Sequence, residues 1–141
     1  MELQQLYSTA KEQNIPIHRR PLPHCRSLSV LVEGCCAIAM DPEVCDEGAL
    51  ERTHLSHELG HCLTGSFYNA YSRHDLRRKH ENRANKWAVQ ALIPAAALDE
   101  AIAKGNTEMW QLAEYFGVTE SFMRKAVCYH VHGNLATELY F

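Results

Sequence analysis

Apolar residues recur along the chain with two different spacings, and each spacing predicts a different kind of element. Near the start, Leu3, Leu6 and Ala10 follow the three-to-four-residue period of an amphipathic helix. This pattern predicts a first helix over residues 2–13, which ends before Pro16 because proline lacks the amide proton that a helix interior needs.

Over residues 27–40 the apolar period changes to two, which is typical of a half-buried strand. Glu33 and Gly34 stand in the middle of this segment and can form a two-residue turn, so the segment predicts a β-hairpin. Ile15 and Ile17 alternate in the same way and indicate a third short strand. We therefore expect a small antiparallel sheet.

Beyond Pro42 the apolar spacing is helical throughout, and glycine or proline follows most of the segments. The predicted helices cover residues 46–64, 75–93, 95–104, 107–116 and 120–130, the last behind Thr119 as N-cap. A small sheet followed by a helical remainder indicates the α+β class.

The composition is that of a globular domain, with 46% apolar and 22% charged residues in a chain of 141. A chain of this length can bury a hydrophobic core without metal or disulfide staples, so any metal is available for function. We expect one domain over residues 1–141, made of an N-terminal helix and sheet (1–45), a central pair of helices (46–93) and a C-terminal helical part (94–141).

The net charge and the apolar runs of the chain exclude some classes of function. The chain has 14 Lys and Arg against 17 Asp and Glu, and this net charge of −3 argues against a nucleic-acid or membrane-surface binder. No run of apolar residues is long enough to span a bilayer, and the first residues lack the features of a secretory signal, which predicts a cytoplasmic protein. Six cysteines without a CxxC pair are then expected to be reduced thiols, with Cys62 packed in the core.

The chemistry lies in the HExxH motif formed by residues 57–61, inside a predicted helix. Four residues advance a helix by about 400°, so His57 and His61 project from one face and can bind one tetrahedral metal ion. Glu58 is turned about 100° away from His57, where it can miss the metal and still reach a water bound to it. This is the placement of a general base in a zinc hydrolase.

A catalytic zinc site requires a third protein ligand, and the start of the next predicted helix offers four residues of suitable chemistry. These residues are His74, Asp75, His80 and Glu81. Helical spacing places both His80 and Glu81 on rows that can face the first two ligands across an antiparallel helix pair, so spacing alone leaves both open.

Three segments together resemble the ImmA/IrrE family of metallopeptidases. They are HELGH at residues 57–61, E-x-x-A-N-x-W-A at residues 81–88, and the apolar run into Pro94. The resemblance covers about residues 25–141. It implies a zincin core of the gluzincin type, one zinc ion per chain, and Glu81 as the third ligand after His57 and His61.

The resemblance also implies a function for that site. Members of the family are typically encoded by phages and mobile elements, and the best understood cleave helix-turn-helix repressors. This chain is similar to the compact phage or mobile-element type, so we expect a zinc metalloendopeptidase whose partner is such a repressor. The loop after the motif offers four side chains that could stabilise the transition state, namely Tyr68, Tyr71, Arg73 and His74.

A second hypothesis is a non-catalytic, zinc-containing transcriptional regulator that binds DNA. Residues 111–126 resemble a helix-turn-helix, with Ala113 inside the first helix and Gly117 at the turn. The charge is against it, because residues 94–141 carry three basic and six acidic side chains. The peptidase is therefore the favoured prediction.

Overall fold

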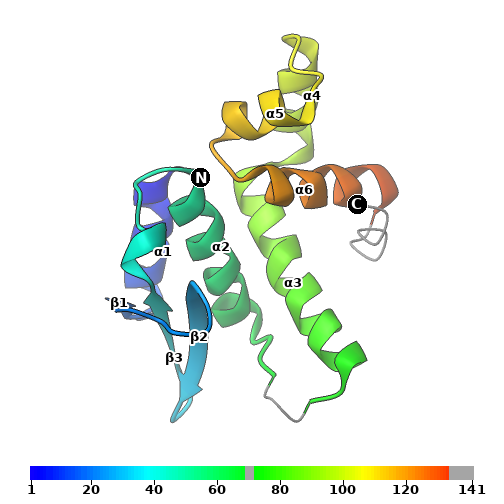
Figure 1. Ribbon diagram of the computed structural model, residues 1–141. Coiled ribbons are helices and arrows are strands. Elements are labelled where there is room, and N and C mark those ends of the chain that lie inside the picture. The colour runs from blue at the N-terminus through cyan, green and yellow to red at the C-terminus, as the bar shows by residue number, and fades with distance from the viewer. Residues whose placement is uncertain (69–71, 134–141) are drawn as a thin grey trace.

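The computed structural model describes residues 1–68 and 72–133 and has α+β architecture (Figure 1). In chain order its elements are α1 (Leu3–Glu12), β1 (Ile17–Arg19), β2 (Ser27–Val32), β3 (Cys35–Met40), the 3₁₀ turn η1 (Pro42–Val44), α2 (Ala49–Thr64), α3 (His74–Leu92), α4 (Ala95–Ala103), α5 (Met109–Phe116) and α6 (Glu120–His132). Within the described ranges, no helix combines the length and the apolar character that a bilayer-crossing segment needs.

Most predicted elements are present with small shifts of their ends. The hairpin of β2 and β3 turns at Glu33 and Gly34, both of which have positive φ. Helix α2 begins at Ala49 instead of residue 46, because the Asp46 carboxylate accepts the amide protons of Gly48 and Glu51 ahead of the first helical turn. Helix α6 begins behind the predicted cap, where the Thr119 hydroxyl accepts from the amide of Phe122.

The sheet is mixed, so the prediction of an antiparallel sheet is wrong for one of its strands. The order is β1-β3-β2, with β2 antiparallel and β1 parallel to β3. Arg19 and Ser27 both pair with Met40, which means that β1 ends and β2 begins at the same end of β3. The connection between them only crosses that end, so β1 must run opposite to β2 and therefore parallel to β3.

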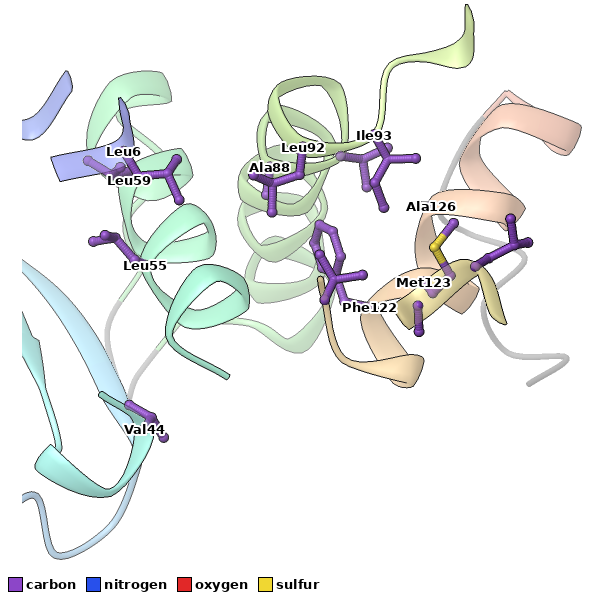
Figure 2. Close-up of a cluster of buried hydrophobic side chains, with 14 of the residues drawn as sticks. Leu6, Val44, Leu55, Leu59, Ala88, Leu92, Ile93, Phe122, Met123 and Ala126 are labelled. Atoms are coloured by element: carbon purple, nitrogen blue, oxygen red, sulfur yellow. The ribbon is translucent and has the colours of Figure 1, made fainter. Parts of the chain in front are cut away.

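Helix α2 lies at the centre of the fold and contacts α1, β2 and β3 on one side and α3 on the other (Figure 1). The leucines at positions 55 and 59 bury completely against this surrounding core. A second part of the core lies between α3 and α6, where Ile93 packs near Phe122 and Met123 (Figure 2). Burial of these side chains on both sides holds α2 and α3 between the sheet and the C-terminal helices.

Polar contacts also join α2 to the turn between α5 and α6. The Arg52 guanidinium donates to the backbone carbonyls of Phe116 and Gly117, and the Thr53 hydroxyl accepts from the amide of Thr119 at 3.1 Å. Burial lowers the pKa of Arg52 more than the nearby charge of Glu2 raises it. The C-terminal helices are thereby attached to the helix that carries HExxH.

The prediction that all six cysteines are reduced thiols is wrong for two of them. Cys36 on β3 and Cys62 on α2 form a disulfide, with their Cα atoms 5.7 Å apart. Cys62 packs against the core as expected, but as a half of this bridge. The two residues are 26 positions apart in sequence, so only the packing of the sheet on α2 brings them together.

Helices α2 and α3 approach each other closely at Gly60. A Cβ atom built at this position would lie 2.4 Å from the carbonyl oxygen and 2.9 Å from the Cα of Ala84. Both distances are shorter than atoms tolerate, so only glycine permits this approach. The glycine of HELGH thus fixes the spacing of the two helices beside the histidines.

Replacing Gly60 by alanine tests this constraint. An alanine in an unhindered helix would raise stability by about 0.5–1 kcal/mol relative to glycine. Here we expect the free energy of unfolding to fall by about 1–3 kcal/mol, because the added methyl group overpacks the helix interface. Urea denaturation of the metal-free protein measures the change.

Gly48→Ala is the matched control, since a Cβ there meets its nearest heavy atom at 3.5 Å. Its effect should stay within about 1 kcal/mol. A Gly60→Ala protein as stable as the unsubstituted one would show that the helices are not in limiting contact.

Candidate metal centre

Two histidines one turn apart on α2 form the centre of the site. Leu55 and Leu59, which lie two positions before them, are fully buried in the core. Two residues correspond to about 200° around a helix, so burying the leucines turns both imidazoles to the other side of α2. The Nε2 atoms of His57 and His61 lie 3.2 Å apart.

Each imidazole is oriented through its second nitrogen. Nδ1 of His57 lies 2.7 Å from the side-chain oxygen of Asn85, and Nδ1 of His61 lies 2.5 Å from the carbonyl oxygen of Ser66. These oxygens accept hydrogen bonds, so each Nδ1 carries the proton and donates it. Both Nε2 atoms are then left to bind a metal, as the outer contacts of metal-bound histidines usually arrange.

Glu81 on α3 completes the group from the opposite side. Its carboxylate oxygens lie 2.9 Å from Nε2 of His57 and 3.1 Å from Nε2 of His61. The ligand atoms of all three residues are within 4.8 Å of one another. The structure therefore brings together the three residues that the sequence and the family resemblance nominate.

The electrostatics of the group favour the ionised form of Glu81. Burial opposes ionisation of Glu81, but its contacts with the imidazoles of His57 and His61 and the hydrogen bond from Tyr68 outweigh burial and hold the pKa of Glu81 well below its usual range. Burial likewise opposes protonation of His61. Its contacts with the Glu81 carboxylate and the Ser66 carbonyl outweigh that effect and raise the pKa of His61.

The three residues fit a tetrahedral metal ion. Ligand atoms about 2.0–2.1 Å from such an ion lie about 3.3 Å from one another. The contacts of 2.9–3.2 Å within the group come close to that separation, so small side-chain movements suffice. Two imidazole nitrogens and one carboxylate leave a fourth position for a further ligand.

That fourth side faces a cavity of about 490 Å³. The cavity is lined by residues 25–29 at the start of β2, by the histidine face of α2, by residues 66–68 and by Glu81. Glu58 also lines it and is only 5% exposed, with one carboxylate oxygen 2.7 Å from the Ser27 hydroxyl. A carboxylate outside the ligand group thus lines the same cavity as the three possible ligands.

The four loop side chains considered as transition-state donors have different positions. The Tyr68 hydroxyl donates to Glu81 at 2.8 Å and lines the cavity. Arg73 is paired with Asp75 at the exposed start of α3, and His74 lies beside Arg78, so neither belongs to the cavity lining. Tyr71 lies outside the described residues.

His80, the alternative third ligand, is not part of the group. Its ring stacks on that of Tyr68, with centroids 6.5 Å apart. Its buried Nδ1 finds no hydrogen-bond partner among residues 1–68 and 72–133. In the described structure His80 therefore supports the tyrosine, and Glu81 meets the histidines.

Several site residues escape the sequence analysis. Asn85 stands one turn after Glu81 on α3, so its spacing could have suggested a contact with His57. No comparable signal points to Ser27, because it comes from a strand about thirty positions away from the motif. The Ser27 hydroxyl also lies 2.8 Å from Nδ1 of His54, whose pKa is lowered by burial more than nearby Glu58 raises it.

The family model of the IrrE N-terminal-like domain, Peptidase_M78, matches residues 49–127. The chain belongs to this family. The match begins with α2 and ends within α6, so it contains HExxH, the second motif and the helices that follow. Among curated proteins no match to the chain is found.

Membership in a peptidase family gives the metal group a chemical context. The group and the buried Glu58 both lie inside the matched residues, while the sheet precedes them. The matched part of this IrrE-like domain thus carries the ligand set, and the sheet outside it supplies one wall of the cavity.

Substitutions at positions 80 and 81 test the ligand set. Glu81→Ala should weaken metal binding by at least about 10-fold, because it removes one of three ligands, whereas His80→Ala should change it little. Competition with a chromophoric chelator measures both affinities. The reverse ranking would mean that the histidine is the ligand.

Proposed function

We propose that the chain is a zinc-dependent endopeptidase. The observation that carries this proposal is the position of Glu58, a buried carboxylate that lines the same cavity as the open side of the His57, His61 and Glu81 group. Two imidazoles and one carboxylate with an open position are the donor set of catalytic zinc sites in hydrolases.

Zinc, when bound, would supply an acidified water and polarise the scissile carbonyl. Glu58 then acts as the general base that takes a proton from the attacking water. The same carboxyl group returns the proton to the amine that leaves. His57, His61 and Glu81 hold the metal, and the Asn85 and Ser66 oxygens keep the two imidazoles oriented.

Tyr68 is the best-supported donor to the developing oxyanion. It lines the cavity and is already within hydrogen-bond reach of a metal ligand, Glu81. Burial, together with the hydrogen bond to Glu81, raises the pKa of Tyr68 to about 12. The hydroxyl therefore stays protonated at neutral pH and remains able to donate.

The start of β2 offers a way to hold an extended substrate. Within the described sheet, β2 is an edge strand, and its first residues line the cavity. A peptide that adds to this edge would run past the metal group with its backbone fixed by strand hydrogen bonds. The substrate class that suits this arrangement is an unfolded or locally extended protein segment.

We further propose that the substrate is a helix-turn-helix repressor of a phage or mobile element. The support is the likeness of the motifs to that branch of the family, together with an exposed aromatic surface away from the cavity. Trp110 on α5 is 56% exposed, and aromatic side chains of this kind often anchor protein interfaces. Docking there would bring a folded partner to the enzyme before an extended segment enters the cavity.

Glu58→Gln tests the catalytic proposal. Metal analysis should find about one zinc per chain in both the unsubstituted protein and this variant, since Glu58 is not a ligand. Hydrolysis of a mixture of synthetic peptides, followed by mass spectrometry, should fall about 10²–10⁴-fold with the loss of the base. Glu114→Gln, on the exposed side of α5, is the matched control and should keep full activity.

Two results would contradict the proposal. One is a folded protein that binds no zinc, and the other is peptide hydrolysis that survives in Glu58→Gln. Removal of zinc with a chelator should abolish cleavage, and added zinc should restore it. A gel shift at physiological salt addresses the DNA-binding hypothesis, for which we expect no specific complex.

Trp110→Ala tests the docking surface. We expect kcat/KM for cleavage of a helix-turn-helix repressor substrate to fall at least about 10-fold, because an aromatic anchor that the complex would bury is removed. Cleavage of a short peptide that spans the same bond should not change. Val131→Ala, which removes an exposed apolar side chain from α6, is the control. Equal losses on both substrates would argue against a docking role.

A further inference from the structure

A chain of three polar side chains connects the sheet to Glu58. Ser27, the first residue of β2, places its hydroxyl 2.7 Å from Oε2 of Glu58 and 2.8 Å from Nδ1 of His54. His54 and Glu58 are one turn apart on α2 and both line the cavity. Strand β2 therefore contacts the proposed base, Glu58, directly, and it also contacts His54 on the helix that carries Glu58.

The chemistry of the three groups fixes the direction of both hydrogen bonds. A carboxylate only accepts, so the Ser27 hydroxyl donates its proton to Glu58. The serine oxygen is then left to accept, and the proton of the second bond must come from Nδ1 of His54. His54 is thus held as the tautomer that carries its proton on Nδ1.

The contact leaves one oxygen of Glu58 available. Oε2 is occupied by Ser27, whereas Oε1 makes no hydrogen bond with the residues that the structure describes. Because Glu58 is only 5% exposed, few solvent contacts compete to orient its carboxylate. One oxygen is anchored to the sheet, and the other is left for the water that the proposed reaction needs.

The Ser27 hydroxyl has no role in the strand ladder. The residue pairs with Met40 of β3 through its backbone. Its side chain instead lies at the cavity wall, between α2 and the start of the edge strand. If Ser27 had only a structural role, its replacement would leave the orientation of Glu58 unchanged.

We propose that Ser27 and His54 are positioning residues for Glu58. They hold the carboxylate with Oε1 directed to the attacking water, and they tie the base to the strand whose edge receives the substrate. This inference rests on the proposed peptidase function. It adds two residues to the catalytic arrangement, one of which lies outside the family match.

The kinetic test compares substitutions that remove or keep each hydrogen bond. Ser27→Ala should lower kcat about 10–100-fold, the effect of losing a hydrogen bond to a charged group, with KM and bound zinc unchanged. Ser27→Thr retains the hydroxyl and should recover most of kcat. His54→Ala should lower kcat less, and His54→Asn, which can still donate, should recover part of it.

Ser8→Ala, on the exposed side of α1, controls for the loss of a serine hydroxyl and should keep full activity. A Ser27→Ala protein with unchanged kcat would overturn the inference. The inference would also fail if Ser27→Thr were as slow as Ser27→Ala, because the hydroxyl would then not be the feature that matters.

A second measurement does not depend on activity. Long-range proton–nitrogen NMR of the zinc-loaded protein reports which ring nitrogen of His54 is protonated. We expect Nδ1–H in the unsubstituted protein and loss of that preference in Ser27→Ala. Nε2–H in an active enzyme would overturn the inference and leave the proposed function intact. Nδ1–H in a zinc-loaded protein that cleaves no peptide would support the contact and refute the peptidase.

Discussion

The close approach of α2 and α3 at Gly60 is the constraint on which the site depends. Only the absence of a side chain lets the carbonyl oxygen of Ala84 come so near to α2. Glu81, about one turn before Ala84, and Asn85, directly after it, reach across the same interface to the two histidines. A wider spacing would separate the carboxylate from the imidazoles, because the side chains have fixed lengths. The glycine of HELGH therefore serves the metal group through helix packing.

On its other side, α2 is held by contacts with the core and the sheet. Leu55 and Leu59 bury against the core, and the disulfide between Cys36 and Cys62 joins the helix to β3. The hydroxyl of Ser27 adds a polar contact from β2 to Glu58. Helix α2 thus cannot rotate toward α3 without breaking contacts with the sheet, so the directions of its histidines and of Glu58 are set together.

The sequence predicts what local spacing controls. Apolar periods are sufficient for α2, α3 and the hairpin, and Thr119 caps α6 as expected. The direction of β1 and the Cys36–Cys62 bridge escape prediction because both depend on contacts between distant segments. The choice between His80 and Glu81 shows the limit most clearly. Around α3, Ala84 points about 40° from His80 and about 60° from Glu81, so spacing cannot choose between them. Which of the two meets the histidines depends on the side of α3 against which α2 places His57 and His61.

In the proposed peptidase, the two essential carboxylates rely on different supports. Glu81 is carried by α3 and meets the histidines because of the Gly60 contact. Glu58 is carried by α2 and is oriented from β2 by Ser27. A displacement of α3 would therefore weaken the metal site while leaving the base in its orientation, whereas a displacement of β2 would disturb the base while leaving the ligands in place. The edge of β2 is also where an extended substrate would pair. The same strand would therefore both bind the substrate and orient the base.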